Sequence, residues 1–301
     1  MTNISKDYIL RKAKRFVYLS FIYIIAFGLA YMILYPYVVK ITTSFMTIMD
    51  LTDATVMFIP RSITTFSWDM ALQYFNLANS YLYSAFAALV IAIIQMIICA
   101  FIGYGFARYT FPGKNILFAL VIFTMLVPFT TLIIPYFLRF RFFNLPFMQL
   151  NLINTIWPSV ILASTGLGLK NGLYIYMFRQ FFRAMPKELE EAAYIDGAGH
   201  FKTFFRIMLP NARASLLTVF LLSFSWQWTD VTFSRVFFST RPIMANSVLS
   251  VLTVQNVLRD SVFISQMRNI STLLVILPIA VLFFLLQRYF IQGIERSGIT
   301  S

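Results

Sequence analysis

Residues Tyr81–Ala107 read YLYSAFAALVIAIIQMIICAFIGYGFA and contain no charged side chain. A helix needs about 20 apolar residues to cross the hydrocarbon layer of a membrane, and this stretch is longer than that. A helix on the surface of a soluble protein would carry charged residues on one face. The stretch therefore predicts a transmembrane helix, in which the amide of Gln95 needs a polar partner.

The rest of the chain has the same apolar character. Of its 301 residues, 59% are hydrophobic and 12% are charged, whereas soluble domains carry about 25% charged residues. This composition excludes a soluble protein, including a soluble nucleic-acid binder, although the formal net charge is +13. We predict an all-α integral membrane fold with a single transmembrane domain over residues 1–301. Its six spans cover residues 16–39, 81–107, 115–138, 152–178, 214–238 and 269–287.

Basic residues orient these spans, because cytoplasmic loops carry an excess of Lys and Arg. If both termini lie in the cytoplasm (N-in, C-in), basic residues on that side outnumber those outside by about two to one. The basic start of the chain resembles a signal peptide. However, the apolar run that follows is about twice the usual length, so we predict an uncleaved first span. Residues 179–213 then form a cytoplasmic loop, and residues 41–80 and 235–268 form external loops.

Small side chains recur along one face of the second span. They are Ala88, Ala92, Cys99, Gly103 and Ala107, spaced at intervals of four and seven. Such a stripe lets a neighbouring helix approach closely. We therefore predict helix packing at this face rather than substrate binding.

The fourth span contains a polar run from Ser164 to Gly172 with one charge, Lys170. Two interpretations remain open. The run can be a break in the helix that lines a cavity, because irregular backbone at membrane depth requires cover by protein or water. Alternatively, Lys170 lies near the end of the span and extends its ammonium group to the interface.

Aromatic and hydrogen-bonding residues gather near the end of the fifth span. An ionisable group within a membrane indicates a functional site, and rings beside polar groups suit a sugar, whose C–H faces stack on Trp. The alternative is an aromatic belt, with Asp230 at the outer water boundary. The candidates for a substrate path are Gln95, Lys170, Trp226, Gln227, Trp228 and Asp230.

The cytoplasmic loop 179–213 reads RQFFRAMPKELEEAAYIDGAGHFKTFFRIMLPNAR. Pro186 suits the first turn of a helix, and the acidic residues after it complement the helix dipole. Gly197 permits the left-handed conformation that ends a helix. A second amphipathic turn follows, and Pro210 closes it. Its apolar side consists of Phe201, Phe204, Phe205 and Met208. We predict two short helices joined by a glycine bend, with a face of small side chains that fits a groove in a partner.

This loop resembles the EAA loop of binding-protein-dependent ABC importer permeases. The match is Glu191-Ala192-Ala193, three residues, Gly197, nine residues and then Ile207-x-Leu209-Pro210. The flanking segments 104–108, 111–114 and 287–290 are similar to the carbohydrate branch of that family. The resemblance implies that the loop contacts a separate ATPase. The residues it assigns to this contact are Glu191, Ala192, Ala193, Asp196, Gly197, Ile207, Leu209 and Pro210.

The resemblance further implies the type I ABC importer architecture, and the chain looks most like the shorter of two paired sugar permeases. The implied partners are a second permease, a cytoplasmic ATPase dimer, an extracellular substrate-binding protein and membrane lipid, with no nucleic acid. ATP and magnesium would bind to the ATPase, so this chain is expected to hold no cofactor and no metal. The implied location is the bacterial cytoplasmic membrane, where the complex would import a carbohydrate, in particular an oligosaccharide.

A second hypothesis is an integral-membrane enzyme that acts on a lipid-linked or acyl substrate. Such an enzyme would use Asp230, Lys170 or His200 as acid–base groups. The chain has no G-x-S-x-G, no H-E-x-x-H and no G-x-x-x-x-G-K motif. We therefore expect a permease without enzymatic activity of its own.

Overall fold

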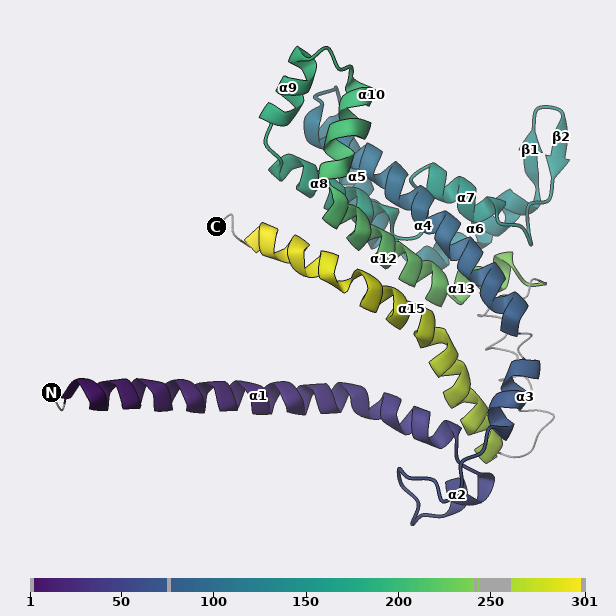
Figure 1. The fold of residues 1–301 in the computed structure, drawn as a ribbon. Coiled ribbons are helices and arrows are strands. Elements are labelled where there is room, and N and C mark those ends of the chain that lie inside the picture. The colour runs from purple at the N-terminus through teal and green to yellow at the C-terminus, as the bar shows by residue number, and fades with distance from the viewer. Residues whose placement is uncertain (1–2, 75–76, 241–242, 244–260, 299–301) are drawn as a thin grey trace. The chain divides into compact units, whose positions relative to one another are not determined.

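The computed structural model describes residues 3–74, 77–240, 243 and 261–298, and nearly all of its regular structure is helical (Figure 1). The chain divides into two compact units. The first comprises Met1–Ala71 and Val254–Leu274, and the second comprises Leu72–Thr253 and Val275–Ser301. Each unit is described by itself.

The first unit contains α1 (Asn3–Ser44), α2 (Ile48–Thr52), most of α3 (Phe66–Tyr74) and the first part of α15 (Ser261–Gly298). Its polar centre is Gln266, which is buried. The Gln266 amide donates to the carbonyl of Met46 at 2.7 Å and to that of Thr43 at 3.0 Å, and its carbonyl accepts from the Ser67 hydroxyl at 2.7 Å. One buried amide therefore joins the end of α1 to α3 and α15.

The second unit is built around α4 (Leu77–Arg108), which packs against α7 (Trp157–Ser164), α8 (Asn171–Ala184) and α12 (Arg213–Thr229). Ala88, Ala92 and Cys99 of the predicted stripe are buried. At Gly103 an added Cβ would lie 2.6 Å from the Cβ of Phe178, so α8 passes too close for any side chain. The prediction that the stripe serves helix packing is confirmed.

This unit also contains the part of α15 from Val275 on and several shorter elements. They are α5 (Lys114–Leu126), α6 (Phe129–Arg141), β1 (Phe143–Leu145), β2 (Met148–Leu150), α9 (Glu188–Ile195), α10 (His200–Thr203), the π-helix η1 (Phe204–Met208), α11 (Leu209–Asn211) and α13 (Thr232–Phe237). The two strands form an antiparallel hairpin in which Phe143 pairs with Leu150.

Three of the predicted spans are continuous helices. Arg11–Ser44, Asn79–Arg108 and Val262–Arg288 are each long and apolar enough to cross a membrane. Among the described residues the number rises to five at most if each bent helix pair counts as one span. The six-span count and the N-in, C-in orientation therefore remain predictions.

The prediction of one continuous helix over residues 115–138 is wrong. The chain bends by 100° between α5 and α6, at Val127 and Pro128. Proline has no N–H group and pushes the residue before it out of the helical region. Val127 accordingly has an extended backbone, with φ −72° and ψ 118°.

The fourth predicted span, residues 152–178, consists of two helices rather than one. Helix α7 ends at Ser164 and α8 begins at Asn171. Between them Gly166 and Lys170 have positive φ, 76° and 64°, which a helix cannot accommodate. The break in the helix is therefore observed, and Lys170 lies exposed at the start of α8.

The fifth predicted span, residues 214–238, is also interrupted. Helix α12 ends at Thr229, and α13 starts again at Thr232 after an extended residue, Asp230. At its other end α12 meets loop 179–213 at a bend of 80°.

Candidate functional site

The loop 179–213 folds largely as its sequence predicts. Helix α9 follows Pro186 and ends at the bend, where Gly197 has φ +74°. The N–H of Gly197 donates to the Tyr194 carbonyl at 3.0 Å and the N–H of Ala198 to the Ala193 carbonyl at 2.9 Å. This pair of bonds is the Schellman motif, which requires a left-handed residue at the position of Gly197. Helix α10 and η1 form the second arm.

The apolar side of the second arm is divided between the core and the surface. Phe204 and Met208 are buried, whereas Phe201 and Phe205 are 69% and 50% exposed. The prediction of a single apolar face is therefore corrected. Phe204 and Met208 anchor the second arm in the core, whereas Phe201 and Phe205 point outward. The outward pair leaves aromatic surface available to another protein.

Helix α9 presents the residues of the family motif to solvent. Glu191, Ala192, Asp196 and Gly197 are exposed, and Ile195 beside them is 84% exposed. Ala193 is buried within the chain. The end of the motif, Ile207-x-Leu209-Pro210, runs from η1 into α11 at the base of the loop. The exposed residues that we predict to contact the ATPase and the buried Ala193 therefore lie on different sides of α9.

Arg108, the last residue of α4, ties the loop to the membrane helices. Its guanidinium donates to the Met185 carbonyl at 2.7 Å, and its Nε lies 3.4 Å from Oε2 of Glu190. Both side chains of this ion pair are at least nine-tenths buried. Sequence reasoning missed the pair. From its neighbours in the sequence, Arg108 is an ordinary basic residue at the end of a helix. Nothing near it indicates that it pairs with Glu190, 82 residues further along the chain.

The Gln95 side chain is the hub of a polar network inside the second unit. Its amide donates to the Leu169 carbonyl at 2.9 Å and to Oδ1 of Asn171. Its carbonyl accepts from the Ser223 hydroxyl and, at 3.5 Å, from Gln227. The polar partner that a buried amide requires is present, and the network holds the break between α7 and α8 against α4 and α12. Asn171 and Ser223 were not among the predicted site residues.

The other predicted substrate-path residues fall into two groups. Trp228 is buried, and its indole N–H donates to the Val275 carbonyl of α15 at 2.8 Å. The Asp230 carboxylate accepts from the N–H of Ser234 at 2.9 Å, at the start of α13. By contrast, the side chains of Lys170 and Trp226 are exposed and contact each other. The Lys170 ammonium lies 4.6 Å from the centre of the Trp226 ring.

The cavities next to these residues are small. One of about 20 Å³ is lined by Gln95, Gln227 and Asp230 among others, and one of about 30 Å³ by Gln227, Trp228 and Asp230 among others. A single water needs about 10–15 Å³ measured in this way. Each cavity can hold a water molecule or two and is too small for a sugar.

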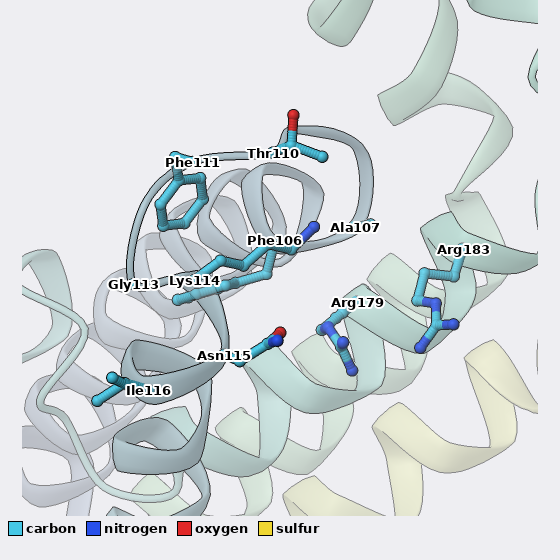
Figure 2. Close-up of a pocket in the computed structure, with 10 residues that line it drawn as sticks. All are labelled: Phe106, Ala107, Thr110, Phe111, Gly113, Lys114, Asn115, Ile116, Arg179 and Arg183. Carbon is cyan, nitrogen blue, oxygen red and sulfur yellow. The ribbon is translucent and has the colours of Figure 1, made fainter.

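A larger cavity of about 740 Å³ lies where α4, α5 and α8 meet (Figure 2). Its lining includes Arg179 and Arg183 of α8, Phe111 of the loop after α4, and Lys114 at the start of α5, all labelled in Figure 2. No sequence-predicted site residue lines it.

Comparison with known proteins identifies the chain. Residues 97–296 match the family described as binding-protein-dependent transport system inner membrane component. This chain belongs to that family. The permease is thus an integral membrane subunit of a binding-protein-dependent ABC importer, and the predictions of a multi-pass cytoplasmic-membrane location and of a permease rather than an enzyme are confirmed.

Individual relatives match over most of the permease. It is 32% identical to an osmoprotective compounds uptake permease of Synechocystis, covering 82% of this chain and 80% of the relative. It is 28% identical to an arabinooligosaccharides transport permease of Halalkalibacterium halodurans, covering 96% and 99%. A maltodextrin transport permease of Streptococcus pneumoniae is 26% identical, covering 95% and 97%.

The fold also matches a solved transporter. A chain of a bacterial ABC transporter involved in the import of alginate superposes with a TM-score of 0.68, at 20% identity, covering 93% of this chain and 98% of that one. The predicted all-α integral membrane permease fold is confirmed. The alternative of a membrane enzyme finds no support, because the matched family and these relatives are transporter permeases. His200, one of the acid–base candidates, lies in loop 179–213 and is hydrogen-bonded to Tyr194.

Proposed function

We propose that this permease is one of two paired subunits that form the translocation path of an ATP-driven carbohydrate importer, with an oligosaccharide as substrate. The observation that carries the substrate class is the match to arabinooligosaccharide and maltodextrin permeases over almost the whole length of the chain. The match is not confined to the loop that all such importers share.

The loop 179–213 is the contact with the ATPase dimer. Its exposed side offers Ile195 and Phe201 next to the motif residues, and aromatic and aliphatic anchors of this kind dominate protein interfaces. On the buried side of the loop, the Met185 carbonyl accepts a hydrogen bond from Arg108 of α4. A push on the loop is therefore transmitted to α4 as a rigid-body motion.

The substrate path runs along the exposed face that carries Trp226 and Lys170. The internal cavities are too small for a sugar, so the path must be completed by the second permease subunit. The Trp226 ring provides a stacking platform, and the Lys170 ammonium over it provides a hydrogen-bond donor. Gln95, Trp228 and Asp230 hold the helices that present this face.

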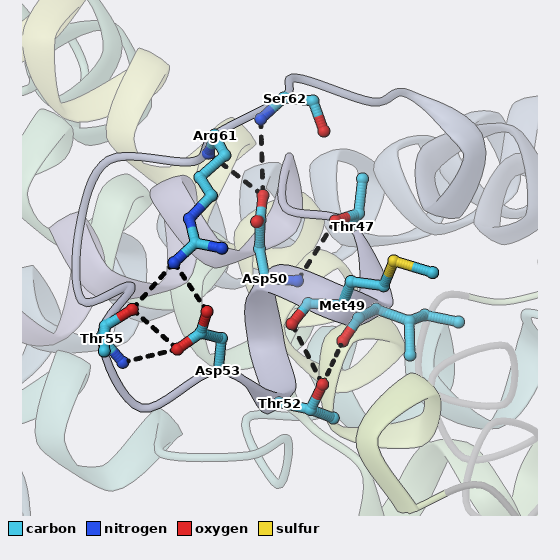
Figure 3. Close-up of polar contacts among 9 residues, drawn as sticks. Thr47, Met49, Asp50, Thr52, Asp53, Thr55, Arg61 and Ser62 are labelled. Atoms are coloured by element: carbon cyan, nitrogen blue, oxygen red, sulfur yellow. Dashed lines mark hydrogen bonds and ion pairs between the residues drawn. The ribbon is translucent and has the colours of Figure 1, made fainter.

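The external loop 41–80 is the docking surface for the substrate-binding protein. Asp50 is buried and accepts from the N–H groups of Arg61 at 3.1 Å and Ser62 at 3.5 Å, and Asp53 pairs with Arg61 at 2.7 Å (Figure 3). On this framework the loop exposes Met49 and Ile59, 83% and 84%. The second loop that we predict for this role, residues 235–268, lies largely outside the described residues.

Co-purification and uptake test the proposal. The tagged permease should co-purify with a second permease and an ATPase, and cells should take up labelled arabino-oligosaccharide or maltodextrin only when all subunits and the binding protein are present. Uptake of an osmoprotective compound in place of a carbohydrate would contradict the substrate class but not the transporter. Isolation of the permease without either partner would contradict the assembly itself.

A crosslink tests the docking surface. A photoreactive residue in place of Met49 should crosslink to the binding protein, whereas one in place of the cytoplasmic Ile195 should crosslink to the ATPase. Exchange of the two products would reverse the proposed orientation.

A further inference from the structure

The cavity between α4, α5 and α8 is strongly cationic (Figure 2). Lys114, Arg179 and Arg183 line it, and none of the residues that line it is acidic. Like charges repel, so an anion bound between these cations would relieve their repulsion. No residue that lines it belongs to the polar network around Gln95 or to the EAA motif, although Arg179 and Arg183 lie at the start of loop 179–213.

The Arg179 side chain is held in place by a ring contact, but one of its hydrogen-bond donors lacks a partner. Its guanidinium carbon lies 3.8 Å from the centre of the Phe118 ring, a contact that holds the side chain in place. Its Nε is buried and has no hydrogen-bond partner within the protein. Burial, followed by the charge of Arg183, lowers the pKa of Arg179 from its usual value. A buried donor that lacks a partner marks a place where a ligand oxygen can bind.

The surface next to the cavity is apolar. Helix α5 begins at Lys114 and has no buried residue. Its first turns expose Ile116 and Leu117 at 70% and 47%, and Leu120 and Phe123 continue the exposed surface at 54% and 58%. A cationic cavity therefore leads directly to a helix surface that suits hydrocarbon chains.

We propose that this cavity is a binding site for the phosphodiester headgroup of an anionic phospholipid, with Lys114, Arg179 and Arg183 around the phosphate and the acyl chains along α5. All three basic residues belong to segments at or next to the predicted cytoplasmic side. Anionic lipids and the potential that attracts basic residues are found in the cytoplasmic leaflet. A free phosphate ion would use the same cations but would leave the apolar surface of α5 uncovered. The site does not depend on which substrate the importer carries.

Native mass spectrometry of the purified full-length permease, co-purified with its partners, tests the site. The probes are phosphatidylglycerol, phosphatidylcholine and inorganic phosphate. Each basic residue near an anionic surface contributes about fivefold in affinity, so Arg179→Gln with Arg183→Gln should weaken phosphatidylglycerol binding about 30-fold. Arg179→Lys with Arg183→Lys keeps both charges and should retain most of it.

The matched control is Lys202→Gln with Arg206→Gln. It removes two exposed basic residues of the same cytoplasmic region that do not line the cavity, and it should leave lipid binding unchanged. Equal loss of binding in this control, or equal binding of phosphatidylcholine, would overturn the site. Competition by inorganic phosphate at the same concentration as the lipid would overturn the assignment to lipid. Lipid binding that appears only after the ATPase is removed from the complex would show that a segment of the ATPase occupies the site, and it would overturn the assignment to lipid.

Discussion

At the scale of single residues, two buried polar groups hold the parts of the second unit together. The Glu190 carboxylate pairs with the Arg108 guanidinium where the loop meets α4. The Gln95 amide donates a hydrogen bond to the Leu169 carbonyl in the break between α7 and α8. Each would be costly to bury alone. Their roles are structural, but both act on the segments that we propose to move during transport.

Replacement of Glu190 tests the anchor of the loop. Glu190→Gln leaves the buried cation of Arg108 uncompensated, which should destabilise the permease by about 3 kcal/mol. The measurement is the temperature at which the detergent-solubilised protein loses its monodisperse elution peak. Glu191→Gln removes the same charge from the next, exposed residue and should change stability by less than about 0.5 kcal/mol. An equal shift in the two variants would contradict the anchoring role.

Replacement of Gln95 tests the polar network. Gln95→Leu leaves the buried hydroxyl of Ser223 and the carbonyl of Leu169 without this partner, at a cost of about 1–3 kcal/mol for each group. Gln227→Leu, at the edge of the network, should cost less. The same thermal measurement separates the two variants, and equal stability of Gln95→Leu and wild-type protein would refute the network.

At the scale of elements, two segments shape the proposed contacts with other proteins through their backbone conformation. One is the glycine bend between α9 and α10, and the other is the loop after α2, which the carboxylates of Asp50 and Asp53 hold in place. Both are exposed, and both owe their shape to local hydrogen bonds rather than to a packed core. Their conformation can therefore be altered without disturbing the membrane helices.

Gly197→Asp tests whether the bend couples the permease to the ATPase. The φ of +74° strains a side chain even though space around the residue is open, at a cost of about 1–2 kcal/mol. We expect uptake to fall at least about tenfold while the membrane level, measured by immunoblot, is retained. Gly199→Asp adds the same group where φ is −72° and should transport normally. Normal uptake by Gly197→Asp would refute the proposed coupling.

Protonation of Asp53 tests the external loop. Hydrogen bonds from the side chain and then the backbone of Thr55 lower the pKa of this carboxyl, and the charge of Arg61 adds to the effect. Because the folded pKa is lowered, the loop contacts persist above the ordinary pKa of Asp and are lost as pH falls through the lowered one. Thr55→Ala should raise the pKa, as followed by NMR of a labelled Asp53. Thr52→Ala removes a hydroxyl that bonds to the carbonyls of Ile48 and Met49, so a similar rise there would contradict this account.

At the scale of the molecule, the second unit depends on close packing around α4. The residue that permits the closest approach is Gly103, which faces Phe178 of α8. Because α8 leads into the coupling loop and α4 ends at its anchor, this contact determines how the loop is carried by the membrane helices.

Gly103→Ala tests this packing. The new Cβ would lie 2.6 Å from Phe178 and 3.0 Å from the N of Arg179, and such overpacking should destabilise the permease by about 1–3 kcal/mol. Gly105→Ala is the matched control, since nothing lies within 4 Å of its Cβ and Ala favours a helix. The control should be neutral or stabilising, and a stable Gly103→Ala variant would contradict the close approach.

The sequence by itself determined the membrane class, the helices at 16–39, 81–107 and 269–287, the packing stripe of α4, the two-helix coupling loop and the family. These features follow from local composition and spacing, which a chain carries wherever it folds. Tertiary structure decided the break at Lys170, the burial of Glu190 rather than Glu191, and the use of Gln95, Trp228 and Asp230 within the protein. It also brought Lys114 to Arg179 and Arg183. The physical reason is that a buried polar group takes its role from the partner that folding places beside it, and that partner is distant in the sequence.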